Sequence, residues 1–317
     1  MNLFINIEIT VLNQIFAKLR LFFLLALVSI LLAACDQEHA VEYSPKYSDS
    51  PMLAGEKVYI FGIHPLHNPK RLHEIFGPIA DYLSENIDGV RFKIEASRNY
   101  ASFNKKLYSR KFHFALPNPF QTVNSFKHGY NVFGKMSDDE NFRGIFLVRK
   151  DSNIKKVSDL KGHAVSFPAP TALAATMLPQ YYLQKHGLNV MKDIDIKYVG
   201  SQESSVMNVM LGNTIAGATW PPPWRALSKE RPELAKELTV IWQTESLPNN
   251  SLVVRDDIKE SIVAEVKKLL LNLHKQQQGK KWLAKMELSK FEKANNDTYE
   301  PVVGFIARFN KEVRPVN

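Results

Sequence analysis

The alternation of short apolar runs with amphipathic segments is the feature of this sequence that most restricts its fold. An apolar run at 57–63 is followed by apolar residues at helical spacing over 72–83, and a second run begins at Val90. The order restarts after a long predicted strand at 142–152, with HAVSF at 163–167. Strands that alternate with helices of about 10 to 15 residues favour largely parallel sheets flanked by helices. The sequence therefore predicts an α/β protein with two lobes.

The first 34 residues have the pattern of a secretory signal. An apolar run at 21–34 follows two basic residues and directly precedes Cys35. The run is shorter than the roughly 20 residues of an ordinary spanning helix, which favours a signal peptide that is cleaved. The sequence LAAC also resembles the bacterial lipobox, in which the cysteine is acylated and becomes the first mature residue. The alternative is a retained anchor with an unmodified cysteine, which the long leader containing Glu8 favours.

The rest of the chain divides by composition. Cys35 is the only cysteine, so a disulfide within the chain and a cysteine-based zinc site are excluded, and its expected acylation excludes a thiol nucleophile in the mature chain. We expect a signal peptide at 1–34, a lipid-attached flexible stalk at 35–56, the first part of lobe 1 at 57–143, lobe 2 at 144–242, and a return to lobe 1 with C-terminal helices at 243–317. Resemblance to Gram-negative lipoproteins with aspartate after the cysteine implies retention at the periplasmic face of the inner membrane.

Charge and motifs exclude several functions. The net charge is +9, but the lysines are scattered, and no basic stripe with interleaved aromatics suggests nucleic-acid binding. No G-x-S-x-G, H-E-x-x-H, P-loop or dinucleotide-binding motif occurs, so we expect no enzyme and no cofactor. His64, His67 and His73 have the residue type for zinc. Pro65 interrupts their spacing and no partner carboxylate is evident, so no metal site is expected.

Six segments follow one another along the chain: GPIADYLSE, YASF…LYSRKFHFA, IFLVRKDSNIKKVSDLKG, FPAPT, YVGSQES and TVIWQTESLPNNSLVVRDDI. In this order they resemble segments of the phosphate-, phosphonate- and phosphite-binding subunits of ABC transporters, the PhnD-like group. The resemblance covers roughly residues 57–290. It implies a type II periplasmic-binding-protein fold, with two α/β lobes joined by two crossing strands near 143–150 and 243–254 and the ligand in the cleft between them.

The resemblance also implies a ligand site with altered chemistry. The family's hydroxyl-rich helix start aligns with Pro170–Ala172, where only Thr171 has a hydroxyl, and its first-lobe tyrosine aligns with Tyr100. A second family tyrosine falls on Phe142 and a histidine on Gln202, while Pro222 and Asn250 stand where carboxylates would hold an aminoalkyl group. The expected ligand-binding residues are Tyr100, Thr171, Ser166, Ala172, Gln202, Ser201, Asn250, Phe142, Asn118 and His64.

Two functions remain open at this point. The first is a monomeric, membrane-tethered binding protein of an ABC importer, which closes on a small anionic solute and docks on a permease. The second is a PhnD-like sensor that presents its ligand state to a histidine kinase or a cyclase, which the substituted site favours. Packing roles remain the alternative for several residues, above all the FPAPT turn and Tyr100.

Overall fold

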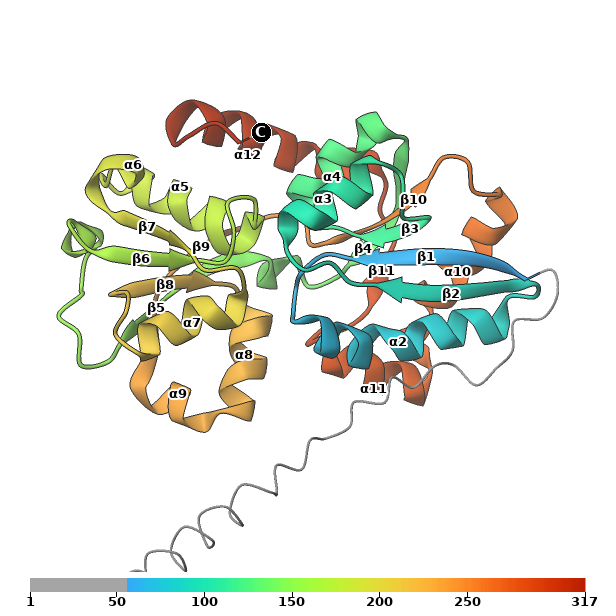
Figure 1. Ribbon diagram of the computed structural model, residues 1–317, viewed down its shortest axis with the longest axis horizontal. Helices are drawn as coiled ribbons and strands as arrows, with labels where there is room; N and C mark the ends of the chain where they lie inside the picture. The colour runs from blue at the N-terminus through green and yellow to red at the C-terminus, as the bar shows by residue number, and fades with distance from the viewer. Residues whose placement is uncertain (1–55, 317) are drawn as a thin grey trace, which may run out of the picture. The chain divides into compact units, whose positions relative to one another are not determined.

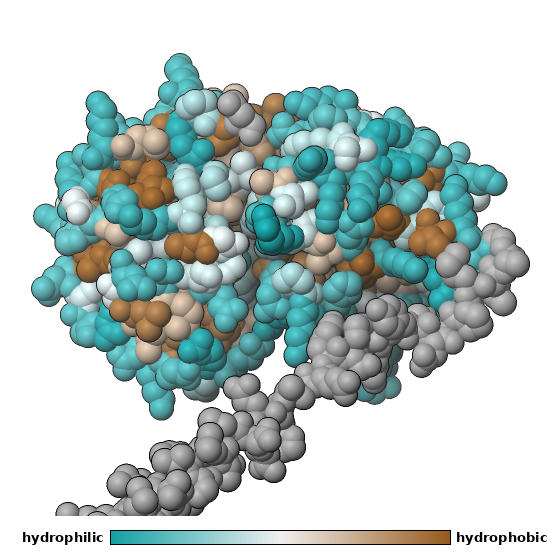
Figure 2. All heavy atoms as spheres, in the orientation of Figure 1, coloured by the Kyte–Doolittle hydropathy of each residue, from teal (hydrophilic) through white to brown (hydrophobic). Residues whose placement is uncertain are grey.

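The computed structural model describes residues 56–316, which form two α/β lobes, each built around its own sheet (Figure 1). The predicted signal peptide, Cys35 and residues 36–55 of the predicted stalk lie outside the described residues. Within 56–316, no helix combines the length and the apolar character needed to cross a bilayer. The visible face is mainly hydrophilic, with separate hydrophobic patches (Figure 2).

The sheet of lobe 1 has six strands in the order β11-β4-β10-β3-β1-β2. β1 pairs in parallel with β2 and β3, while β10 and β4 run antiparallel to their neighbours. The strands are β1 (Lys57–Ile63), β2 (Val90–Glu95), β3 (Phe114–Leu116), β4 (Tyr130–Met136), β10 (Ser251–Arg255) and β11 (Phe291–Glu292).

The sheet of lobe 2 has five strands in the order β7-β6-β8-β5-β9. β6 is parallel to β7 and β8, whereas β5 is antiparallel to β8 and β9. The prediction of largely parallel sheets is therefore wrong, because β10 and β5 each enter their sheet from the opposite lobe and run against their neighbours. The strands are β5 (Arg143–Arg149), β6 (Ala164–Phe167), β7 (Asp195–Tyr198), β8 (Ala216–Thr219) and β9 (Leu238–Ser246).

Helices cover both faces of each sheet (Figure 1). In lobe 1 they are α2 (Pro69–Asn86), α3 (Tyr100–Tyr108), α4 (Pro119–Ser125), α10 (Glu260–Leu271), α11 (Gln277–Lys285) and α12 (Glu300–Glu312). In lobe 2 they are a π-helical turn (Leu173–Met177) followed by α5 (Leu178–Lys185), α6 (Val190–Asp193), α7 (Gln202–Met210), α8 (Pro221–Glu230) and α9 (Pro232–Glu237). α12 packs on both α4 and α5, so it contacts both lobes.

The chain crosses between the lobes twice, at 137–142 and at 247–250. Both crossings are short connections. β5 contains most of the first segment predicted to cross, and β9 contains only the start of the second; the two strands pair with each other within the sheet of lobe 2. The apolar core of lobe 1 continues into lobe 2 through residues 172–175 and Trp220, so the two lobes are packed together where the chain crosses.

Candidate functional site

A small cavity lies between the lobes and is lined by residues of both. Its free volume is about 10 Å³, which is room for about one water molecule. No aspartate, glutamate, lysine or arginine lines it. The lining residues are His64, Leu66, Tyr100, Asn118, Phe142, Ala172, Leu173, Ala174, Ala175, Gln202, Trp220 and Asn250.

The start of the helix at 173–185 supplies main-chain donors to this cavity. Ala172 is the N-cap residue, and the first helical hydrogen bonds are donated by the N–H groups of Thr176 and Met177, both to the Ala172 carbonyl. The N–H groups of residues 173–175 consequently have no carbonyl partner in their own helix. Free N–H groups and the positive end of the helix dipole form a ready site for an anion.

The first turn of this helix is a π-helix, and two residues explain its position. Pro179 has no N–H, and its ring displaces the carbonyl four residues earlier, so an α-helical turn is disfavoured there. Gly144 on β5 lies directly beneath: a Cβ at this position would come within 2.6 Å of both the Ala174 carbonyl oxygen and the Pro179 ring. Only glycine lets the helix start approach the sheet this closely.

A chain of hydrogen bonds joins the lobes across the cavity and leaves a hydroxyl proton available. Thr219 Oγ1 donates to Gln202 Oε1 at 2.8 Å. Because this oxygen already accepts from Thr219, Gln202 interacts with the Tyr100 hydroxyl oxygen through its amide N–H. The Tyr100 O–H is then left to donate into the cavity. Burial raises the pKa of Tyr100, despite the opposing hydrogen bond from Gln202, so the phenol stays protonated.

Two hydrogen-bond acceptors also face the cavity. His64 Nδ1 lies 2.8 Å from the Leu116 carbonyl oxygen, which can only accept, so Nδ1 carries the proton. Burial lowers the pKa of His64 to about 4, which keeps the ring neutral and leaves Nε2 with a lone pair. Asn250 is fully buried, and its Oδ1 has no hydrogen-bond partner.

The remaining lining is apolar or already hydrogen-bonded. Phe142 packs edge-on against Trp220, with ring centroids 5.6 Å apart. Asn118 caps α4, where its Oδ1 accepts from Gln121, and its Nδ2 donates across the lobes to the Thr171 carbonyl at 3.0 Å. Asn118 therefore ties the lobes together, and the second N–H of its amide remains available as a donor.

Seven of the ten expected ligand-binding residues line the cavity. Three others lie elsewhere. The Ser166 hydroxyl donates to the Ser205 carbonyl inside lobe 2, and the Ser201 hydroxyl caps α7. Thr171 contributes only its carbonyl, to Asn118, because the helix starts at Leu173 and not at Pro170. The seven that line it are His64, Tyr100, Asn118, Phe142, Ala172, Gln202 and Asn250.

Sequence reasoning missed Leu66 and residues 173–175 as lining residues. Alanine and leucine side chains carry no polar group, so the residue types at 173–175 do not indicate that their main-chain N–H groups are hydrogen-bond donors in a site. The one available signal is Pro179, which predicts a disturbed turn just before it. Among the described residues, no group of three or more histidine, cysteine, aspartate or glutamate side chains is arranged to hold a metal ion.

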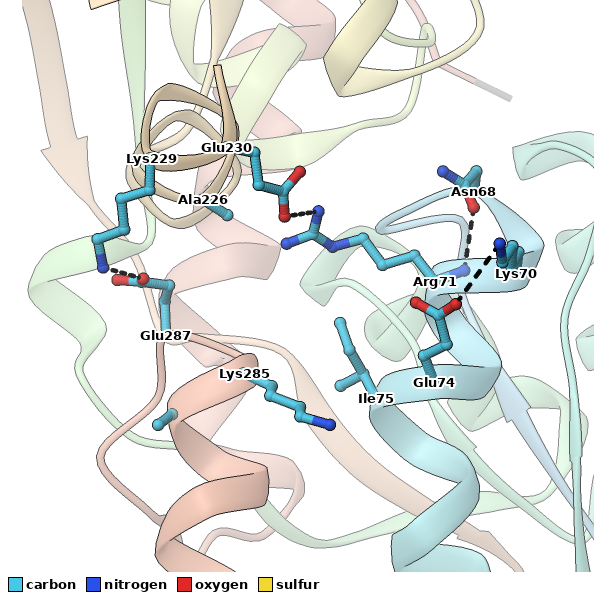
Figure 3. Close-up of a pocket in the computed structure, with 11 residues that line it drawn as sticks. Asn68, Lys70, Arg71, Glu74, Ile75, Ala226, Lys229, Glu230, Lys285 and Glu287 are labelled. Atoms are coloured by element: carbon cyan, nitrogen blue, oxygen red, sulfur yellow. Dashed lines mark hydrogen bonds and ion pairs between the residues drawn. The ribbon is translucent and has the colours of Figure 1, made fainter. Parts of the chain in front are cut away.

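A second hollow, the rim groove, lies between α2, α8 and the end of α11 (Figure 3). It has a volume of about 630 Å³ and, unlike the cavity, is dominated by charges. Ion pairs cross it between the lobes: Arg71 with Glu230, and Lys229 with Glu287 at 2.6 Å. Its charged lining residues are Lys70, Arg71, Glu74, Lys229, Glu230, Lys285 and Glu287.

Glu287 is the centre of the rim contacts. Its backbone has φ +54°, a conformation that non-glycine residues rarely adopt. Its carboxylate accepts from both Lys229 and Arg225 on α8, and Arg225 also donates to Asn141 at 3.1 Å. Burial raises the pKa of Glu287, but the hydrogen bonds from these two cations outweigh it and hold the pKa below its ordinary value. The rim groove therefore fastens α8 of lobe 2 to lobe 1.

Two α/β lobes with a cavity between them that is lined by polar groups from both have the architecture of a two-lobed binding protein. The model of the periplasmic substrate-binding proteins of phosphonate ABC transporters matches residues 61–299. The chain belongs to this family, which is one of binding proteins and not of enzymes, and the class predicted from the sequence is confirmed.

Individual relatives agree with this assignment. A probable ABC transporter phosphite binding protein, PhnD1, from Prochlorococcus marinus is 26% identical over 282 residues, covering 83% of this chain and 93% of the relative. The solved structure of PhnD1 in complex with methylphosphonate has a TM-score of 0.74 at 23% identity, covering 80% of this chain and 99% of that one. A binding component of an ABC phosphonate transporter from Pseudomonas aeruginosa also has a TM-score of 0.74, at 19% identity, covering 81% and 88%.

Proposed function

We propose that this protein captures a small phosphonate- or phosphite-like oxyanion in the cavity between its lobes and presents it to an ABC permease. The observation that carries the proposal is the helix start at Leu173, where the N–H groups of three residues that line the cavity have no partner in their own helix. These donors and the Tyr100 hydroxyl stabilise negative charge without a formal countercharge. The ligands named for PhnD1 are of this chemical class.

Closure follows from contacts that a ligand would make to both lobes. His64, Tyr100 and Asn250 belong to lobe 1, while residues 172–175 and Gln202 belong to lobe 2. A ligand that touches both groups binds the closed form better than the open form, and so shifts the population towards closure. The free volume of about 10 Å³ has room for about one water molecule and not for a phosphonate, so binding requires the lobes to move apart from this arrangement.

The test is a ligand screen with the full chain purified in mild detergent. We expect thermal stabilisation by methylphosphonate, phosphite or phosphate, and saturation at 100 times the dissociation constant adds about 2.7 kcal/mol to the free energy of unfolding. Absence of any shift across these oxyanions would contradict the proposal. The fold assignment would stand.

We further propose that the protein is a lipoprotein attached through Cys35 to the periplasmic face of the inner membrane. The support is the order of basic residues, apolar run and LAAC in the first 35 residues. Metabolic labelling with a radioactive fatty acid tests this. We expect label in the wild-type chain and none in Cys35→Ala, and equal labelling of both would refute lipidation at this residue.

A further inference from the structure

The cavity lining contains hydrogen-bond acceptors as well as donors, and two of these acceptors have no donor among residues 56–316. Asn250 Oδ1 is fully buried and unpartnered. The orientation of this amide is fixed by its other end: Nδ2 lies 3.5 Å from Met136 Sδ, and a thioether sulfur can only accept. Oδ1 is therefore the atom left without a partner in a residue that lines the cavity.

His64 supplies a second acceptor. Its Nδ1–H donates to the Leu116 carbonyl, so in the neutral ring Nε2 presents a lone pair. Among residues 56–316, no group donates a hydrogen bond to Nε2. An oxyanion without a hydroxyl group would place an oxygen lone pair against the lone pair of each acceptor. A ligand O–H would instead donate a hydrogen bond to one of them.

We propose that this cavity selects oxyacid monoanions that still carry one acidic hydroxyl, such as hydrogen phosphonates and hydrogen phosphite, and rejects sulfonates and fully ionised phosphonates. The inference rests on the proposed function and specifies its substrate class. The main-chain N–H groups of residues 173–175 and the Tyr100 hydroxyl bind the charged oxygens, while Asn250 Oδ1 or His64 Nε2 accepts the ligand proton. A buried acceptor left without a donor is costly, which makes such a site a strong filter.

Titratable groups of the protein do not account for the same preference. The titratable residues of the lining are His64 and Tyr100. His67 and Arg71 lie with Leu66 in a neighbouring pocket, and Asp139 accepts a hydrogen bond from the backbone N–H of Asn249. Burial and the nearby Arg71 and His64 lower the pKa of His67 to about 3, so it is neutral in the relevant range. The ligand is then the group whose protonation changes near neutral pH, as phosphoryl groups do.

Methylphosphonate and methanesulfonate provide the test, because at about pH 5.5 they have nearly the same shape and the same single charge, and only the phosphonate has an O–H. We expect calorimetric titration of the full chain to give at least about 10-fold tighter binding of methylphosphonate. Its affinity should fall about 10-fold per pH unit above the second ligand pKa, while the weak sulfonate binding stays flat. Sulfonate binding within about 3-fold of phosphonate, or phosphonate binding that tightens with pH, would overturn the inference.

A variant locates the acceptor. Asn250→Leu keeps the size of the side chain and removes Oδ1, so the preference for methylphosphonate over methanesulfonate should fall by about 5-fold or more. Asn124→Leu, in α4 outside the cavity lining, is the matched control and should keep the wild-type preference. An unchanged preference in Asn250→Leu would show that Asn250 does not accept the ligand proton. The comparison of methylphosphonate with methanesulfonate binding to the wild-type chain tests the inference even if this variant does not fold. If no oxyanion binds, the proposed function fails as well.

Discussion

The cavity and the rim groove lie between the same two lobes but are built from opposite chemistry. The cavity has no formal charge in its lining and offers main-chain N–H groups, a phenol, an amide and a neutral imidazole. The rim groove has seven charged side chains and ion pairs that cross between the lobes. Under the proposed function, the neutral dipoles of the cavity hold the ligand, while the ion pairs of the rim groove connect the two lobes.

The first prediction concerns a negative charge introduced into the uncharged lining of the cavity. Ala174→Asp puts a carboxylate beside the free N–H groups of the helix start, and like-charge repulsion of several kcal/mol should abolish detectable oxyanion binding. Calorimetric titration with methylphosphonate measures the effect. Ala226→Asp makes the same change in the rim groove and should alter affinity less than about 3-fold. If both variants bind alike, the two regions do not differ as described.

The second prediction concerns the protonation of His64, in the cavity lining, at low pH. The pKa of His64 is lowered to about 4 by burial, so below its ordinary value of 6.5 the unfolded chain takes up a proton that the folded chain does not. Stability is therefore fully present above about pH 6.5 and should be lost, by about 1 to 3 kcal/mol, as the pH falls towards 4. Thermal unfolding across this range should show a shallower slope in His64→Gln. An equal slope would mean that His64 is not the group responsible.

The third prediction removes one neutral donor. Tyr100→Phe keeps the ring but loses the hydroxyl, and a hydrogen bond to a charged group is worth about 1.5 to 3 kcal/mol. Affinity for methylphosphonate should fall by about 10-fold or more, as measured by titration. The control is Tyr108→Phe in the same helix, whose ring stacks on His128 and which does not line the cavity. Wild-type affinity in Tyr100→Phe would show that this tyrosine serves packing alone.

The fourth prediction concerns the rim and has the smallest effect. Glu287→Gln removes the ion pairs to Arg225 and Lys229, each partly exposed and worth up to about 1 kcal/mol. We expect affinity to fall about 3- to 10-fold, with a weaker dependence on salt than in the wild type. Glu233→Gln breaks an ion pair with Arg231 that lies within lobe 2 and is the matched control. A loss of equal size in the control would show that the rim pairs do not act through closure.

The sequence predicted the order of elements well and the details of the site only in part. The two-lobed α/β architecture followed from the apolar periodicity, but the antiparallel pairing of β5 and β10 depends on where the chain crosses, which periodicity does not encode. The resemblance placed the helix start at Pro170–Ala172, yet the first helical residue is Leu173, where Pro179 and Gly144 shape the first turn. The rim ion pair between Lys229 and Glu287 joins residues that are 58 positions apart in the sequence, and the pair between Arg71 and Glu230 joins residues 159 positions apart. No local sequence pattern predicts such pairs.

Under the proposed function, the helix start holds its ligand through main-chain donors, and this affects how the site can evolve. Substitutions at positions 173–175 other than to proline alter the bulk of the side chains but leave every amide hydrogen in place. Descendants of this gene could therefore enlarge or shrink the cavity, and so exchange one substituent on phosphorus for another, while keeping the groups that bind the negative charge.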